Sequence, residues 1–204
     1  MFYTSTTRIK NPAIPLISID TMSNFIGKDI VITEKLDGES ITMYSDYIHG
    51  KNIDGRYHSS RNWVKDYHNQ IKHNIPIGDR LCGENLYAQH SIPYNNLLSY
   101  FYGIMYWSYN LCLDYDNTIT IFANLDIPTP RLLYKGLYDD KIISNLIAEL
   151  ELEHIEGFVI RNQNSFHYDD FSTNVVKWIH SEYNRNDDWK YQSIISNQLQ
   201  SERQ

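Results

Sequence analysis

Apolar residues that recur every three or four positions predict the helices of this 204-residue chain. One helix is predicted at 61–74, and it ends where Asn74-Ile75-Pro76 breaks the pattern, since proline cannot continue a helix. A polar terminal helix is predicted for 187–204, with apolar anchors at Trp189, Ile194, Ile195 and Leu199. The clearest helix, at 140–152, has one continuous apolar face made of Ile142, Ile143, Leu146, Ile147 and Leu150.

Short apolar or alternating runs predict strands at 30–32, 40–44, 81–86, 100–107, 156–161 and 174–179. Residues 118–122 fit either a strand or a helix, and residues 1–28 predict an irregular lead-in with one short helix. No repeat, linker or low-complexity segment divides the chain, and its length suits one domain better than two small ones. The pattern predicts an α+β fold in which helices cover mostly antiparallel sheets.

The net charge of -7 argues against a protein whose whole surface binds nucleic acid. A local basic lining is still compatible with that charge, and the candidates are Lys51, Arg56, Arg61 and Lys65. The alternative is that these four residues only solvate an ordinary loop and helix.

Cys82 and Cys112 form no CxxC pair, so neither a disulfide framework nor a cysteine zinc site is indicated. The histidines at 49, 58, 68 and 73 also form no metal-ligand pattern. No run approaches the roughly 20 apolar residues that a membrane span needs, and no secretory leader is evident. We therefore expect a soluble cytoplasmic protein in a reducing compartment, with no membrane partner.

Lys35-Leu36-Asp37-Gly38 connects the apolar run at 30–32 to the alternating run at 40–44. Asp-Gly between two β-prone runs is the commonest short hairpin signal, because glycine accepts the positive φ of a tight turn. Such a turn can also project the preceding lysine into a cleft as a nucleophile. Four further segments follow in order: Gly83-Glu84-Asn85, Ser99-Tyr100-Phe101-Tyr102-Gly103, Glu156-Gly157-Phe158-Val159-Ile160-Arg161 and Val175-Val176-Lys177-Trp178-Ile179.

In this order the five segments resemble the motifs of the covalent nucleotidyltransferases, the superfamily of polynucleotide ligases and mRNA-capping guanylyltransferases. The phrases at 33–40, 82–88 and 165–168 are most similar to small ATP-dependent RNA ligases. The resemblance covers residues 8–180. It implies an α+β adenylyltransferase (nucleotidyltransferase, ATP-grasp-like) domain at 1–180, with antiparallel sheets flanked by helices, and a short helical C-terminal tail at 181–204.

The resemblance also implies a reaction. Lys35 would attack the α-phosphorus of ATP, expel pyrophosphate and become lysyl-AMP; AMP would then pass to an RNA 5′-phosphate, and a 3′-hydroxyl would displace it. A lysine amine attacks only after losing its proton, which burial or nearby cations favour. Mg²⁺ (or Mn²⁺) and Lys177 could supply that cationic field, and Glu156 would bind the metal.

By the same resemblance the expected nucleotide site consists of Glu34, Lys35, Asp37, Gly38, Arg56, Glu84, Phe101, Glu156 and Lys177. Asp37 would accept from a sugar hydroxyl or orient the lysine, and Glu84 could instead be an ordinary ion-pair partner. Strand alternation places Tyr100 and Tyr102 on one face and Phe101 on the other, and Phe101 is our choice to stack on adenine.

Arg56 and Arg61 occupy the interval where the relatives place an arginine that contacts the nucleotide or the RNA, and the sequence does not decide between them. Many relatives also carry a second lysine two residues after the closing lysine, where this chain has Ile179. His180, Arg185 or Lys190 could substitute for that missing lysine. The expected partners are RNA ends and an accessory RNA-binding protein.

Three alternatives remain open. A DNA ligase or capping enzyme would share the motifs, although those relatives normally append an oligonucleotide-binding barrel after the closing lysine strand. A nucleotide- or RNA-binding module that has lost turnover would account for the missing lysine. The adenylate could also be passed to a protein or a small molecule.

Overall fold

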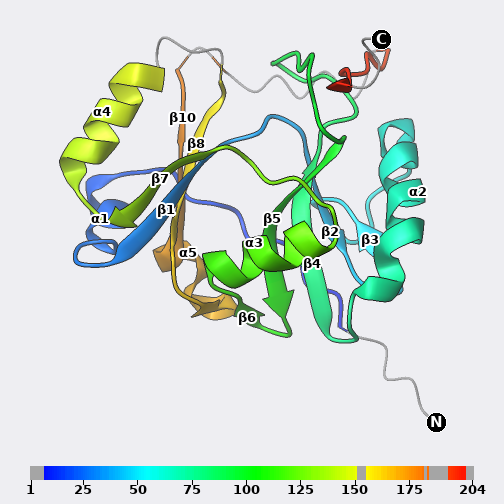
Figure 1. Ribbon diagram of the computed structural model, residues 1–204, viewed down its shortest axis with the longest axis horizontal. Helices are drawn as coiled ribbons and strands as arrows, with labels where there is room; N and C mark the ends of the chain where they lie inside the picture. Colours follow the sequence, from blue (N-terminus) through cyan, green and yellow to red (C-terminus); the bar gives the residue numbers. More distant parts are fainter. Residues whose placement is uncertain (1–6, 151–154, 182, 184–192, 201–204) are drawn as a thin grey trace.

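A computed structural model describes residues 7–150, 155–181, 183 and 193–200. Two antiparallel sheets lie side by side, with helices on their outer surfaces (Figure 1). The smaller sheet has the strand order β10-β8-β1-β7, and the larger one β3-β2-β4-β5-β6-β9. This arrangement confirms the predicted α+β class.

The strands are β1 Asp29–Glu34, β2 Glu39–Met43, β3 Ile48–His49, β4 Asp79–Asn85, β5 Phe101–Ser108, β6 Leu111–Cys112, β7 Leu132–Leu137, β8 Gly157–Asn162, β9 Phe166–His167 and β10 Val175–Ile179. The helices are α1 Ile19–Ser23, α2 Asn62–Ile71, α3 Tyr115–Asn124, α4 Asp140–Leu150 and α5 Phe171–Asn174. Three 3₁₀ turns accompany them, η1 Ser59–Arg61, η2 Lys72–Asn74 and η3 Tyr168–Asp170.

The smaller sheet buries one face under α4. Along β1, Ile30 and Ile32 are fully buried and pack with Ile143 and Leu150 of α4, as the periodicity of that helix predicted. Phe158 and Val176 of the neighbouring strands join the same cluster. The opposite face of this sheet is turned toward the larger sheet, and Val159 and Val175 pack there with Cys82 and Trp107.

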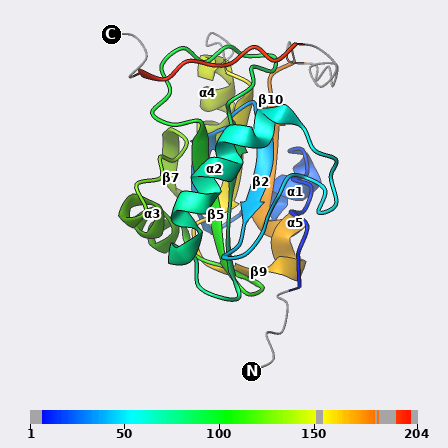
Figure 2. The ribbon, with the colours of Figure 1, turned by 90° about the vertical axis from the view of Figure 1, so that its right-hand side faces the viewer.

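The larger sheet is covered on its outer face by α2 and α3 (Figure 2). Val64 and Ile71 of α2 and Phe122 of α3 pack against Ile41 and Phe101. The open choice at 118–122 is resolved as a helix, because the Asp114 side chain caps the first turn of α3 by accepting from the Asn117 N–H at 2.9 Å.

Two predicted elements were wrong. β1 and β2 belong to different sheets, so residues 35–38 are a link between sheets and not the turn of a hairpin. The described part of the predicted terminal helix, 193–200, is no α-helix: it forms isolated bridges from Ser196 to Ala88 and from Leu199 to Leu97. The rest of that prediction lies outside the described residues. Among the described residues, no helix is both long and apolar enough to cross a membrane.

Candidate active site

The ends of β1 and β8 bring Lys35 and Glu156 together. The Lys35 N–H donates to the Gly157 carbonyl at 2.9 Å, which continues the β1–β8 ladder by one residue. Lys35 Nζ then reaches Glu156 Oε2 in an ion pair and lies 3.4 Å from its neighbouring carbonyl, that of Leu36. Side-chain exposure is 8% for Lys35 and 2% for Glu156. The charge of this buried lysine is therefore balanced by the Glu156 carboxylate.

Lys177 lies on the same face of the smaller sheet as Lys35. Thr33 in β1 is opposite Val159 in β8, and Val159 is opposite Lys177 in β10, so these three side chains share a face. Strand alternation adds Lys35, two residues after Thr33, to that face. Because Val159 packs against the larger sheet, both lysines are turned into the space between the sheets.

Glu84 and Tyr102 enter the same space from the larger sheet. They are directly opposite each other in β4 and β5, and Glu84 is opposite Ser40 in β2. Two residues earlier on β4, Cys82 packs against Val159 of the smaller sheet, so this face of the larger sheet also looks inward. We name the group of residues placed here on the facing sides of the two sheets the inter-sheet cleft; it consists of Lys35, Glu156, Lys177, Glu84 and Tyr102.

Asp37 holds loop 86–98 in place, because its hydrogen bonds go to that loop and not to other residues of the link at 35–38. Its Oδ2 accepts from the Ser91 N–H at 2.7 Å and from the Ile92 N–H at 3.0 Å, and its own N–H donates to Tyr94 Oη at 2.9 Å. His90 Nδ1 lies 3.9 Å from Asp37 Oδ1. With 6% exposure, Asp37 anchors loop 86–98 to the link between the sheets, which supports the lysine-orienting alternative over a sugar contact.

Gly38 is required by close packing, not by a positive φ. A Cβ at this position would lie 2.6 Å from the Asn85 carbonyl oxygen and 2.7 Å from Leu86 Cδ2. Gly157 does have a positive φ, +150°, and its Cβ would meet the Trp178 carbonyl oxygen at 2.1 Å. Both glycines therefore let the chain approach a neighbouring strand beside Lys35 and Glu156.

A family model for RNA ligases matches residues 28–179, which include every strand and residue that forms the cleft. The chain belongs to the RNA ligase family. This confirms the family that the order of the motifs indicated. A search of curated proteins finds no match.

Solved structures with a similar fold include other ligases. An archaeal ATP-dependent RNA ligase is 13% identical with a TM-score of 0.61, over 85% of this chain and 48% of its own. For the Naegleria gruberi RNA ligase with PPi the values are 19% and 0.61, over 86% and 57%. A putative ATP-dependent DNA ligase from Aquifex aeolicus gives 14% and 0.59, over 84% and 50%. The chain spans about half the length of these proteins, and the likeness shows a shared fold.

The adenine-stacking role predicted for Phe101 is wrong. Its ring is 0% exposed in the core cluster under α2 and leaves no surface for a base. Tyr102 is on the cleft face beside Glu84. A bulge in β5 adds Ile104 without a partner on β4, since Cys82 is opposite Met105 and the next residue is opposite Gly103. The aromatic residue that this RNA ligase family member presents to the cleft from β5 is therefore Tyr102.

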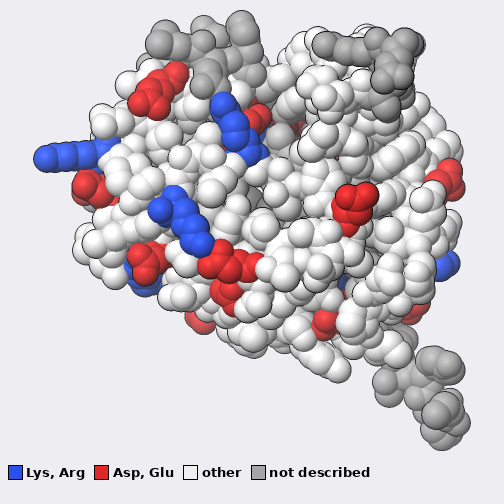
Figure 3. Space-filling view, viewed as in Figure 1, with Lys and Arg blue, Asp and Glu red and all other residues white. Residues whose placement is uncertain are grey.

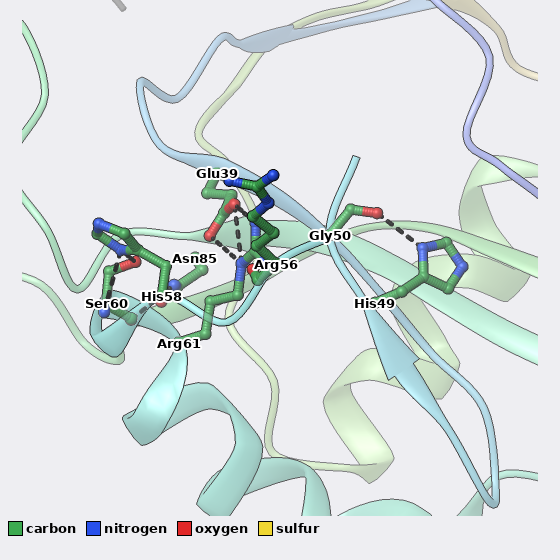
Figure 4. A network of polar contacts seen from close by, with 8 residues as sticks. All are labelled: Glu39, His49, Gly50, Arg56, His58, Ser60, Arg61 and Asn85. Atoms are coloured by element: carbon green, nitrogen blue, oxygen red, sulfur yellow. Dashed lines mark hydrogen bonds and ion pairs between the residues drawn. The ribbon is translucent and has the colours of Figure 1, made fainter. Parts of the chain in front are cut away.

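Arg61 is engaged in a structural ion pair on the outer face of the larger sheet (Figure 4). Its Nε donates to both oxygens of Glu39 at 2.9 Å, and Nη2 also contacts Oε1. This bond raises the pKa of Arg61 above its ordinary value. Glu39 is the residue before Ser40 on β2, so it points away from the cleft. Arg56 is exposed, and its carbonyl accepts from Arg61 Nη1 at 3.1 Å.

Glu34 Oε2 accepts from Arg131 Nε at 3.1 Å. Burial and the nearby Glu34 carboxylate raise the pKa of Tyr102, so Glu34 lies within electrostatic reach of that ring. Of the residues proposed to replace the missing second lysine, His180 is 8% exposed. Its backbone N–H donates to the Glu156 carbonyl at 2.9 Å. Arg185 and Lys190 lie outside the described residues. The structure thus pairs Lys35 with Glu156 and places Glu84 and Lys177 on the facing sides of the two sheets, away from the side chains of Phe101 and Arg61.

Charged side chains of both signs are interspersed on the face shown in Figure 3, which carries no continuous basic patch. Within the described ranges, no three His, Cys, Asp or Glu side chains group as metal ligands. Sequence reasoning missed Tyr94, whose hydroxyl meets Asp37. Its position in an irregular loop gave no periodic signal, and only the apolar and aromatic content of 86–100 hinted that this loop is packed.

Proposed function

We propose that this chain is an ATP-dependent RNA ligase that acts through a lysyl-AMP intermediate on Lys35. The observation that carries the proposal is the buried pair of Lys35 and Glu156 in the inter-sheet cleft. In a fold that needed only a strand link, a lysine desolvated against one carboxylate would have no evident purpose, since such pairs add little stability over apolar packing. Lysine is also one of the side chains that serve as nucleophiles in covalent catalysis, and desolvation is one way to activate it.

The proposed first step forms one bond and breaks another. Lys35 Nζ, after giving up a proton, attacks the α-phosphorus of ATP; the bond from that phosphorus to the bridging oxygen breaks, and pyrophosphate leaves. The pair with Glu156 must part for this attack. Lys177, on the same sheet face, is positioned to neutralise a phosphate charge that develops. AMP would then move to an RNA 5′-phosphate and be displaced by a 3′-hydroxyl.

A divalent cation fits the carboxylates of the cleft. Mg²⁺ is bound in proteins by one or two carboxylates together with substrate phosphates, so a cluster of three acidic ligands is not required. Glu156 and Glu84 would hold it, and it would supply Lewis-acid stabilisation of the phosphate charge. The Naegleria gruberi RNA ligase has also been solved as a mutant with ATP and Mn. Mg²⁺ or Mn²⁺ is therefore the proposed metal.

Labelled nucleotides test the donor. We expect protein incubated with Mg²⁺ and labelled ATP to carry a covalent adduct that acid releases. Labelled GTP or NAD should give much less adduct. The Lys35→Ala variant should lose the label, whereas Lys141→Ala, which removes an exposed lysine on α4, should keep it. Wild-type protein that never retains label would favour the alternative of a binding module without turnover.

A chase tests the acceptor. Adenylylated protein should pass AMP to a 5′-phosphorylated RNA nick or end and then seal it. The DNA ligase alternative has its own support, because a putative ATP-dependent DNA ligase shares the fold. Faster transfer to 5′-phosphorylated DNA than to RNA would favour that alternative, and transfer to neither would point to a protein or small-molecule acceptor.

A further inference from the structure

The described C-terminal segment, residues 193–200, lies along loop 86–98 at the end of the molecule where the inter-sheet link crosses (Figures 1 and 2). Backbone bonds hold the two together, including Gln89 N–H to Ile195 O at 2.8 Å and Leu97 N–H to Gln198 O at 3.0 Å. The segment contributes Leu199 to the cluster that contains Leu36, the residue after Lys35. A stretch far away in the sequence therefore packs beside the proposed nucleophile.

Asn197 is the centre of this contact and is 2% exposed. Its backbone N–H donates to Tyr87 O at 2.9 Å, and its carbonyl accepts from Tyr100 Oη at 3.0 Å. Its side chain donates through Nδ2 to Leu86 O at 2.7 Å and accepts through Oδ1 from the Tyr94 N–H at 2.9 Å. Both ends of the amide and both backbone groups are thus bonded to the loop or to the start of β5.

One of those bonds leads directly to the Lys35 link. Tyr94, whose N–H is held by Asn197, accepts the Asp37 N–H with its hydroxyl at 2.9 Å. The Ser91 and Ile92 N–H groups of the same loop bind the Asp37 carboxylate. Asp37 is two residues from Lys35. The path from Asn197 to the Lys35 link therefore runs through the partly buried side chain of Tyr94 to the backbone N–H of Asp37, a residue that is 6% exposed.

We propose that Asn197 is a positioning residue for the adenylylation step: it fixes loop 86–98 in the conformation that holds Asp37, and through Asp37 it sets the position of Lys35 Nζ. This inference rests on the proposed function, since it assigns a role in the reaction of Lys35. An asparagine suits the role because its side chain donates at one end and accepts at the other, as the two loop groups require. A displaced nucleophile loses rate steeply, since about 1 Å can cost 10²-fold.

The test compares Asn197→Ala and Tyr94→Phe, singly and together, with the control Gln198→Ala. Gln198 belongs to the same segment but has an exposed side chain. The rate of lysyl-AMP formation is measured against ATP concentration, well below the unfolding midpoint of each variant. We expect both single variants to lower the maximal rate about tenfold or more, with a smaller change in the KM for ATP, and the control to match wild type.

The double variant decides whether the two residues act on one path. If they do, it should be no slower than the slower single variant. A rate loss in the double variant equal to the product of the two single losses would overturn the positioning role. So would single variants that keep the wild-type rate and only unfold at a lower midpoint, since Asn197 would then serve only to hold the C-terminal segment in place. Tyr94→Phe keeps the ring and carries the test if Asn197→Ala does not fold. A wild-type protein without adduct would instead overturn the proposed function, and this inference with it.

Discussion

Two ion pairs in this molecule each join a basic residue to a glutamate, but they differ in contact geometry and in location. Lys35 and Glu156 meet through a single contact in the inter-sheet cleft, between the ends of two strands. Arg61 and Glu39 meet through a fork of contacts on the outer face of the larger sheet. A planar guanidinium bonded to both carboxylate oxygens is fixed in direction, whereas an ammonium is a point charge on a flexible stem.

The difference separates a pair that can be exchanged from one that holds the fold. The ammonium of Lys35 can leave its carboxylate by rotation of one side chain, because a single contact with Glu156 Oε2 joins the two. The guanidinium of Arg61 is enclosed by backbone, because a Cβ at Gly50 would lie 3.1 Å from its Nη2. We therefore propose a catalytic role for the first pair and a structural role for the second.

Neutralising the carboxylate of each ion pair should give the largest difference between the two pairs. Glu156→Gln should slow lysyl-AMP formation by at least about 100-fold, because the cleft loses the charge that pairs with the lysine and the proposed metal. Glu39→Gln should keep the rate at low temperature and lower the free energy of unfolding by about 1–3 kcal/mol, because Arg61 loses its charged partner. Rapid-quench adduct assays and urea unfolding measure the two effects. Equal loss of rate in both variants would contradict the assignment.

Added methyl groups sharpen the same contrast. Gly38→Ala should lower the rate of adduct formation about tenfold or more, because the new Cβ collides with the backbone carbonyl of Asn85 and displaces the Lys35 link. Gly50→Ala places its Cβ 3.1 Å from Arg61 Nη2, away from the Lys35 link, so it should leave the rate near that of wild type. Both variants are assayed as soluble folded protein, checked by circular dichroism. A fast Gly38→Ala enzyme would show that the link tolerates displacement.

The two aromatic residues of β5 give a smaller effect. Tyr102→Ala should raise the KM for ATP about tenfold, since stacking of a base on an aromatic side chain is worth about 1–3 kcal/mol. Phe101→Leu should leave that KM unchanged and lower the unfolding free energy by about 1 kcal/mol, as expected for a near-conservative change in a packed core. Steady-state kinetics at varied ATP measures the first. If the KM for ATP rose in Phe101→Leu and not in Tyr102→Ala, adenine would have to bind on the Phe101 face of β5.

Acid should weaken the outer region slightly. Burial lowers the pKa of His68, which lies on α2 and contacts the Tyr44 carbonyl at 2.6 Å, below its ordinary value of 6.5. The unfolded chain therefore takes up a proton first as the pH falls, and stability present above pH 6.5 is lost below it. His68→Gln should reduce the slope of unfolding free energy between pH 5 and about 7. Some slope should remain, because burial also lowers the pKa of His49.

The sequence predicted most elements but not how they are arranged. The periodic faces of α2 and α4 and the order of the motif strands were sufficient to locate them and to indicate the family. Alternation along β5 gave two faces without showing which one is buried, so Phe101 was assigned to the base. A local Asp-Gly signal could not show that β1 and β2 join different sheets. Edge strand β7, with its exposed Leu132 and Leu137, was missed because its burial is irregular.

The candidate site divides in the same way. Lys35, Glu84, Glu156 and Lys177 were predicted because motif residues on adjacent strand ends converge wherever the strands pair. Asn197 and Tyr94 were not, because their roles depend on hydrogen bonds between an irregular loop and a distant segment. Over residues 193–200 the predicted terminal helix was wrong for the same reason, because backbone partners in loop 86–98 satisfy this segment in a form that is not α-helical.

Peptide mapping of the protein after exposure to ATP and Mg²⁺ is the decisive test of Lys35 as the nucleophile. We expect one covalent AMP per chain, carried by the peptide that contains Lys35 and released by acid. An AMP found on Lys177 or any other lysine, or none on a protein that binds ATP, would contradict it.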